Sequence, residues 1–455
     1  MGQQGGYALL AILLIATMFQ FQRGTIKHLN LAREHAKQQE AAEASGATIE
    51  PLEKDHKGAI GRWRSEIHDF WEGENIYRGL HPNMPFVVVL LSPFTYVSVP
   101  MMALLFNLCK LAAVLATFWM AVRIANHRDD RMPEWVALLG VLAVIDFYVG
   151  DIQHGNTNVF VAASVVAHLY CYRRGRDSLA GVFLALGICL KLTPALFLLY
   201  WLWQREWKVL GATATALPAM VLSPALLTGW EFYAVCMATW WTELIGPSLG
   251  GAWYPIHINQ SLPAMIGRFF SGGDAGNYLW NPEEHAVPIE FGWVTLLDLG
   301  PQGARMLLRA LQVAMLAWTL WAIGWSRLDR DDGRRALHYG LLVALMLLLN
   351  QRSWDHHATY LVVAHVALAY AAARSALPLR TRRWIGWSQF ATVVWMLLVS
   401  GDLIEEIYGD DGAHRVLAYG TAFWHFLAVW ALCLILTTKL RRAKNPYLCE
   451  DAGEN

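Results

Sequence analysis

Residues 334–374 determine the fold class of this chain, and their sequence is RRALHYGLLVALMLLLNQRSWDHHATYLVVAHVALAYAAAR. Two apolar runs, 336–350 and 357–374, meet at the polar turn NQRSWDHH, and arginines stand at the far end of each run. A membrane-crossing helix consists of about 20 mostly apolar residues, and positive residues tend to stay on the cytoplasmic side. The stretch therefore predicts two antiparallel membrane helices with arginines inside and a polar turn outside.

The rest of the chain repeats this pattern. Apolar runs occur near residues 7–22, 100–124, 135–149, 156–172, 179–190, 194–203, 209–228, 305–326, 336–350, 357–374, 384–400 and 414–438. Six basic clusters fall on one side if every run crosses once: Arg123/Arg128/Arg131, Arg173/Arg174/Arg176, Arg205/Lys208, Arg327/Arg330/Arg334/Arg335, Arg374/Arg380/Arg382/Arg383 and Lys439/Arg441/Arg442/Lys444. We predict an all-α, polytopic membrane protein, a single helical membrane domain over 1–455 with about 12 transmembrane or re-entrant helices.

Two long segments lie on the outer side in this scheme. The first outer loop, 23–99, is expected to hold amphipathic helices, and the second, 229–304, is rich in Gly, Pro, Asn and Trp. Residues 439–455 form a cytoplasmic tail. The run 7–22 has no basic leader and no cleavage site, so we expect a retained anchor. Four basic residues follow this run on the side that the scheme makes the outer one, and so disagree with it. We interpret them as part of an extracytoplasmic helix: Arg23, Lys27, Arg33 and Lys37.

The composition agrees with a membrane protein. Hydrophobic residues make up 56% of the chain and charged residues 16%, whereas a soluble domain carries about 25% charge. The net charge of zero gives no indication of a nucleic-acid partner. The six cysteines are scattered without a CxxC pair, so neither a disulfide framework nor a zinc site is expected.

Polar residues at membrane depth are costly and usually functional. One such group is GDIQHGNTN at 150–158, in which Gln153, His154 and Asn156 are candidate substrate-binding residues. The alternative is a polar turn with helix-capping asparagines.

Lys191 lies in a second polar break, KLTP, between apolar runs of about 12 and about 10 residues that are too short to cross a bilayer. We expect a re-entrant or broken hairpin there, which is tolerated where it lines a cavity. A buried ammonium needs an anionic partner, and phosphate fits. The alternative is a lysine that snorkels to the interface.

The turn 350–357 is the third polar group. Arg352, His356 and His357 suit an anion or a metal ion. Adjacent histidines on a helix diverge by about 100°, which argues against shared metal coordination. We therefore predict phosphate binding and proton relay, with no metal and no cofactor.

The first outer loop supplies the carboxylates. Its segment DHKGAIGRWRSEIHDFWEG has apolar residues at helical spacing, which predicts an amphipathic helix that docks on the membrane surface. Asp55, near the start of this helix, is the preferred general base, and Glu66 and Asp69 remain alternatives.

These motifs resemble glycosyltransferase family 87, polyprenyl-phosphate-sugar-dependent mannosyltransferases and relatives with the GT-C fold. The resemblance is carried by GDIQHGNTN, by the Gly181–Pro194 stretch that ends in KLTP, by RSWDHH, by GENIYRG followed by HPNMPFVVVLLSPF, and by Asn259-Gln260-Ser261. It runs in order from about residue 55 to about residue 370. It implies that Asn259 and Gln260 belong to the substrate site and that Asp55 approximates the family's catalytic Asp, about one helical turn upstream of the expected place.

The resemblance implies a membrane glycosyltransferase that moves a sugar, mannose among the candidates, from a polyprenyl-phosphate donor to a lipid or glycan acceptor. The carboxylate would deprotonate the acceptor, and cations would stabilise the departing phosphate. The active site would face the non-cytoplasmic side of the cell membrane. A transporter or lipid-linked-sugar flippase is the alternative, because broken hairpins and buried polar residues occur there too. A catalytically inactive relative is a third possibility.

Overall fold

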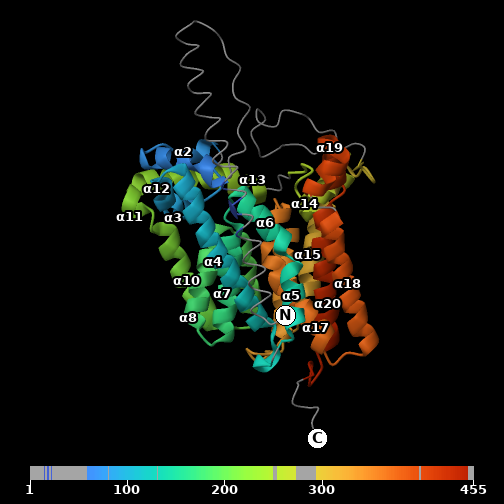
Figure 1. Cartoon of the computed structure of the whole chain (residues 1–455). Coiled ribbons are helices and arrows are strands. Elements are labelled where there is room, and N and C mark those ends of the chain that lie inside the picture. The colour runs from blue at the N-terminus through green and yellow to red at the C-terminus, as the bar shows by residue number, and fades with distance from the viewer. Residues whose placement is uncertain are drawn as a thin grey trace.

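The computed structural model describes residues 15, 18–19, 22, 59–79, 81–130, 132–249, 254–272, 294–398 and 401–448, with side chains of 407 and 409 alone in the stretch 401–411. Long helices run side by side along one axis, and shorter helices gather at the upper end (Figure 1). In this described part the one β-type contact is an isolated bridge between Ser375 and Tyr447. The predicted all-α class is confirmed.

The helices have the following bounds. The first half contains α2 (Ala59–Trp71), η1 (Ile76–Gly79), α3 (Pro85–Thr95), α4 (Val99–Ala125), η2 (His127–Asp129), α5 (Glu134–Leu142), α6 (Ile145–His154), α7 (Asn158–Arg173), α8 (Asp177–Leu190), η3 (Thr193–Ala195), α9 (Leu196–Trp203), α10 (Trp207–Leu222) and α11 (Ala225–Thr228). The second half contains α12 (Trp230–Trp240), η4 (Trp241–Ile245), α13 (Gly246–Leu249), α14 (Leu262–Phe270), α15 (Gly300–Ile323), α16 (Arg334–Leu348), η6 (Asp355–Leu361), α17 (Val362–Arg374), α18 (Leu379–Leu398), α19 (Gly401–Ala418) and α20 (Thr421–Leu440).

Several helices are suited to a bilayer. Among the described residues, four stretches are long and apolar enough to cross it, and a fifth follows if α5 and α6, bent by 43°, form one span. The four stretches are Val99–Ala125, Trp207–Thr228, Gly300–Ile323 and Gly412–Leu440. These findings support a multi-pass membrane protein, whereas the predicted number of about 12 crossing or re-entrant helices stays a prediction.

The basic clusters gather at one end of the bundle, the lower end in Figure 1. Contacts join the clusters across the sequence: Arg173 to the Ile124 carbonyl, Arg330 to Asp177, and Arg334 to the Ala443 carbonyl. We call this the basic end and the other the site end. The predicted segregation of the arginine clusters to one side is thus present in the fold.

The predicted broken hairpin is formed by α8, η3 and α9. The start of α8 and the end of α9 both lie at the basic end, because Asp177 pairs with Arg330 and Trp203 donates to the Gly324 carbonyl at 2.9 Å. A helix of 14 residues such as α8 is about 21 Å long, which is shorter than a bilayer core. Lys191 at the tip therefore stands at depth inside the bundle. Gly181 permits this packing, since a Cβ there would lie 2.4 Å from the Ala212 Cβ of α10.

The two outer segments contain more regular structure than their composition predicted. The amphipathic helix of the first is α2, and its apolar residues Ile60, Trp63, Ile67 and Phe70 are buried. This face packs on protein, including Phe232 at 5.2 Å from Phe70, so its predicted docking on the membrane surface is wrong. The first outer segment also contains the apolar helix α3, and the second contains α12, η4, α13 and α14.

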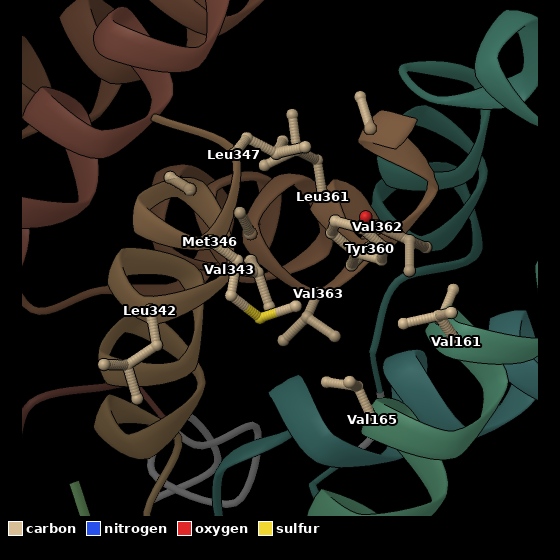
Figure 2. Close-up of a cluster of buried hydrophobic side chains, with 14 of the residues drawn as sticks. Val161, Val165, Leu342, Val343, Met346, Leu347, Tyr360, Leu361, Val362 and Val363 are labelled. Atoms are coloured by element: carbon tan, nitrogen blue, oxygen red, sulfur yellow. The ribbon is translucent and has the colours of Figure 1, made fainter. Parts of the chain in front are cut away.

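A cluster of buried apolar side chains adjoins the polar turn 350–357. Figure 2 shows side chains of α7, α16 and the η6–α17 junction meeting in one cluster. Val161, Val343 and Leu361 have no exposed surface. This rigid apolar base fixes the height and orientation of the turn above it.

Candidate functional site

The α6–α7 corner is the centre of the candidate site. Helix α6 ends at His154, and the next residue, Gly155, has a φ of 64°, the left-handed conformation that glycine adopts after helix ends. The corner brings Asp151 of α6 beside Asn158 at the start of α7, with 2.8 Å between Asn158 Nδ2 and Asp151 Oδ1. The motif GDIQHGNTN is therefore a folded polar corner as well as a helix cap.

Lys191 meets this corner from the hairpin tip. Its Nζ donates to Asn158 Oδ1 at 3.1 Å, and this is its one hydrogen bond to the described part of the chain. An ammonium has three donor hydrogens, so the geometry leaves capacity for an anionic ligand. The tip of the hairpin therefore adjoins the 150–158 group.

Two further buried residues complete the polar centre, and the sequence reasoning did not select either. Lys110 of α4 donates to Asp151 Oδ2 at 3.0 Å and to its carbonyl oxygen at 2.6 Å. Both side chains have no exposed surface. A single lysine inside the apolar run 100–124 was the available signal, since charges at membrane depth are costly unless paired.

The turn 350–357 covers the corner with a cluster of aromatic rings. The rings of His154 and His356 lie 4.7 Å apart, and Asn156 Nδ2 lies 2.9 Å from His356 Nε2. His356 Nδ1 faces Asp355 Oδ1 at 3.3 Å, which fits a tautomer with its proton on Nδ1. Two of the predicted polar groups, 150–158 and 350–357, thus form one cluster.

The rings of His356 and His357 contact each other edge to face, with 4.9 Å between their centres. Their rings are inclined by 87°, and the His357 ring stacks on Trp354 at 5.4 Å. His357 Nδ1 accepts from the Trp354 backbone N–H at 3.2 Å. Both imidazoles therefore contact Trp354, the His356 ring edge-on at 5.3 Å and the His357 ring stacked.

Asn259 and Gln260 are held by internal hydrogen bonds. The Asn259 amide donates to the carbonyls of Tyr254 and Gln351 and accepts from the Ser353 N–H at 2.9 Å. The Gln260 amide donates to the Leu417 carbonyl at 3.0 Å and accepts from the first residues of α20. These residues join the second outer segment to the 350–357 turn and to α19 and α20.

Arg352 lies on the same side of the turn as this loop. Its guanidinium stands 4.9 Å from the centre of the Tyr254 ring. Gln153, by contrast, is exposed on α6, and the structure gives it no part in the corner's hydrogen bonds. The predicted site residues therefore differ in exposure: His356 and His357 are buried, whereas Gln153 and His154 are exposed.

The start of α2 adjoins the corner. The Ile60 N–H donates to the Gly155 carbonyl at 3.2 Å. Glu66 follows almost two helical turns later and pairs with buried His81, and Asp69 is exposed on the outer face of α2. Asp55 lies outside the described residues.

Comparison with known proteins gives consistent matches. A model of glycosyltransferase family 87 matches residues 83–350, which include Lys110, the 151–158 corner and Lys191. The chain is 24% identical over 384 residues to the polyprenol-phosphate-mannose-dependent alpha-(1-2)-phosphatidylinositol mannoside mannosyltransferase of Mycobacterium tuberculosis, covering 78% of this chain and 75% of that protein. It is 26% identical over 330 residues to the corresponding phosphatidylinositol pentamannoside mannosyltransferase of Mycolicibacterium smegmatis, covering 71% and 69%.

Proposed function

The chain belongs to glycosyltransferase family 87, which confirms the resemblance, and from this premise we propose that it transfers a sugar from a polyprenyl-phosphate carrier to a lipid or glycan acceptor at the site end of the bundle. The alternative of a transporter is not favoured, because the family and the similar proteins are transferases. Their names support mannose as the first sugar to test and a lipid-linked acceptor.

One observation carries the proposal: Lys191 stands at the tip of a hairpin inside an apolar bundle, with one hydrogen bond to the described part of the chain. An ammonium in such surroundings requires an anion. An anion attached to a polyprenyl chain reaches this depth from the bilayer, whereas a nucleotide sugar would have to leave water. We therefore assign Lys191 to the donor phosphate.

The reaction needs one base and one stabilised leaving group. The acceptor hydroxyl attacks the anomeric carbon, the bond from this carbon to the phosphate oxygen breaks, and inversion results. The acceptor proton passes to a carboxylate, and the bond electrons leave with polyprenyl phosphate, which gains one negative charge. Lys191, Arg352, His154 and His357 are the groups that we propose to stabilise this charge, and we propose that Gln153, Asn156 and His356 contact the substrates beside it.

Asp55 is the base in this proposal. The start of α2 is tied to the corner through Ile60, and Asp55 precedes Ile60 by five residues, which limits their Cα separation to about 18 Å. Glu66 and Asp69 lie later in α2, where Glu66 pairs with His81 and Asp69 is exposed. Asn259 and Gln260, whose amides are occupied internally, would act by holding the 350–357 turn in place.

The site would face the non-cytoplasmic side of the cell membrane. Positive residues favour the cytoplasmic side, and the arginine clusters occupy the end of the bundle opposite the site.

The test is transfer by the purified full-length protein in lipid nanodiscs. Polyprenyl-phosphate donors with radiolabelled mannose, glucose or galactose would be offered with phosphatidylinositol mannosides and other glycolipids. We expect one polyprenyl-phosphate sugar to be consumed, and Lys191→Met to weaken donor binding at least about tenfold, since a charge-assisted contact contributes about 1.5–3 kcal/mol.

Lys208→Met is the matched control, because Lys208 is exposed at the basic end and should not affect donor binding. Transfer from a nucleotide sugar with no use of any polyprenyl-phosphate sugar would overturn the proposal.

A further inference from the structure

A fully buried ion pair lies behind the proposed donor site. Lys110 of α4 and Asp151 of α6 both have side chains without exposed surface, and the pair is 3.0 Å long. Among the ion pairs of the described residues it is the one in which neither side chain reaches solvent. A buried pair is costly to desolvate, and well-packed apolar residues often serve stability equally well. Its presence next to the donor site therefore indicates a role beyond stability.

Both oxygens of the Asp151 carboxylate accept hydrogen bonds from groups other than Lys191. Oδ2 accepts from Lys110 and from the Val159 N–H at 3.3 Å, and Oδ1 accepts from Asn158 at 2.8 Å. Asn158 stands between this carboxylate and Lys191, and its two bonds fix which way its amide points. Lys191 thus touches an amide oxygen and not a carboxylate.

The charges of the cluster formed by Lys110, Asp151 and Lys191 do not balance. It contains the two ammonium groups of Lys110 and Lys191 and the single carboxylate of Asp151. Because Lys110 is the direct partner of Asp151, the uncompensated positive charge stands at Lys191. The cluster becomes neutral when a singly charged phosphodiester binds there.

We propose that Lys110 is a positioning residue that occupies Asp151 and thereby keeps the charge of Lys191 free for the polyprenyl phosphate of the donor. This inference rests on the proposed function and adds two residues to its site. The proposal predicts that three variants differ in their affinity for polyprenyl phosphate in a pattern that a purely structural role of Lys110 would not produce.

The first variant is Lys110→Met. It leaves the buried carboxylate without its direct partner, so the charges of Asp151 and Lys191, on either side of Asn158, cancel before the donor arrives. We expect the Kd for polyprenyl phosphate to rise at least about tenfold. The second is Asp151→Asn, which removes the competing carboxylate. Binding should then be as tight as in the wild type or tighter.

The third variant is the double change Lys110→Met with Asp151→Asn. It removes both charges of the pair, so Lys191 again carries the net charge of the cluster. Donor binding should return to within about threefold of the wild type. The double variant also avoids an unpaired buried charge, which is the usual cause of misfolding after one partner is removed.

The experiment measures binding of tritiated polyprenyl phosphate to the full-length protein in nanodiscs, with neutral polyprenol as the blank. The wild type, Lys191→Met, the three variants and the control Lys208→Met would be compared, each checked for monodispersity and melting temperature. Weak binding by Lys110→Met together with recovery in the double variant supports the proposal. Equal weakening by Lys110→Met, Asp151→Asn and the double variant, or unchanged binding by Lys110→Met, overturns it.

The same measurement separates the two proposals. If Lys191→Met binds polyprenyl phosphate like the wild type, the donor-phosphate site itself is wrong. If Lys191→Met loses binding and Lys110→Met keeps it, the proposed function stands and the role of Lys110 fails.

Discussion

Two carboxylates of α2, Glu66 and Asp69, have different surroundings. Glu66 is bound to His81, whose side chain is buried, and this pair joins α2 to the segment before α3. Asp69 is exposed on the face of α2 that points away from the protein. Neither carboxylate is directed toward the α6–α7 corner by a contact in the described part of the chain. We therefore keep Asp55 as the proposed base.

We predict that Asp55→Asn lowers the transfer rate by about 10²–10⁴-fold while donor binding survives, because a positioned base contributes that much. Single-turnover transfer and polyprenyl-phosphate binding would be measured on the same preparations. Asp69→Asn is the control and should keep near-normal turnover. Glu66→Gln should lower the melting temperature more than the rate. Near-normal turnover in Asp55→Asn, with loss in Glu66→Gln or Asp69→Asn, would assign the base to that other residue.

At the scale of elements, α14 is attached to the top of the bundle by one buried arginine. Arg268 donates to the carbonyls of Ala418, Ile256 and Asn259 at 2.9, 2.7 and 2.9 Å. Burial lowers the pKa of Arg268, yet a guanidinium remains protonated at neutral pH. The arginine therefore fixes the loop 254–261, and with it the partners of the 350–357 turn.

Arg268→Met should destabilise the protein by on the order of 3 kcal/mol, because several buried carbonyl groups lose their donor. Thermal unfolding followed by tryptophan fluorescence would show the lowered melting temperature. Between pH 6 and pH 8 the difference from the wild type should stay constant, since the lowered pKa of Arg268 still lies above this window and its ordinary value is higher still. Exposed Arg174→Met serves as the control. A melting temperature unchanged by Arg268→Met would contradict this account of α14.

At the scale of the molecule, the sequence predicted the parts of the fold that depend on charge and run length. The gathering of the arginine clusters at one end and the hairpin with Lys191 at its tip follow from the charges and the run lengths. The contact between 150–158 and 350–357 is seen only in the structure. The sequence did not predict which residue pairs with which. A lone lysine in an apolar run needs a partner, but only the packing of α4 on α6 shows that Asp151 pairs with Lys110.

The outer segments show a second reason for incomplete prediction. The resemblance implies that Asn259 and Gln260 belong to the substrate site. In the structure their amides bond to carbonyl and N–H groups of the 350–357 turn, α19 and α20. Short loops rich in Gly, Pro and Asn carry no period that reveals such long-range bonds. The apolar face of α2 likewise identifies a helix, but not whether protein or lipid covers it.

The orientation of the whole molecule gives the last prediction. In a background with Cys449→Ser, Ser65→Cys would place a thiol on the exposed face of α2 at the site end, and Ser326→Cys would place one in an exposed position at the basic end. If the basic end is cytoplasmic, a membrane-impermeant maleimide added to intact cells labels residue 65 and not residue 326 until the membrane is permeabilised. The native cysteines do not interfere, since Cys171, Cys189, Cys236 and Cys433 are buried and Cys109 lies within the apolar helix α4. Labelling of residue 326 in intact cells would place the arginine clusters outside and move the proposed transfer site to the cytoplasmic face.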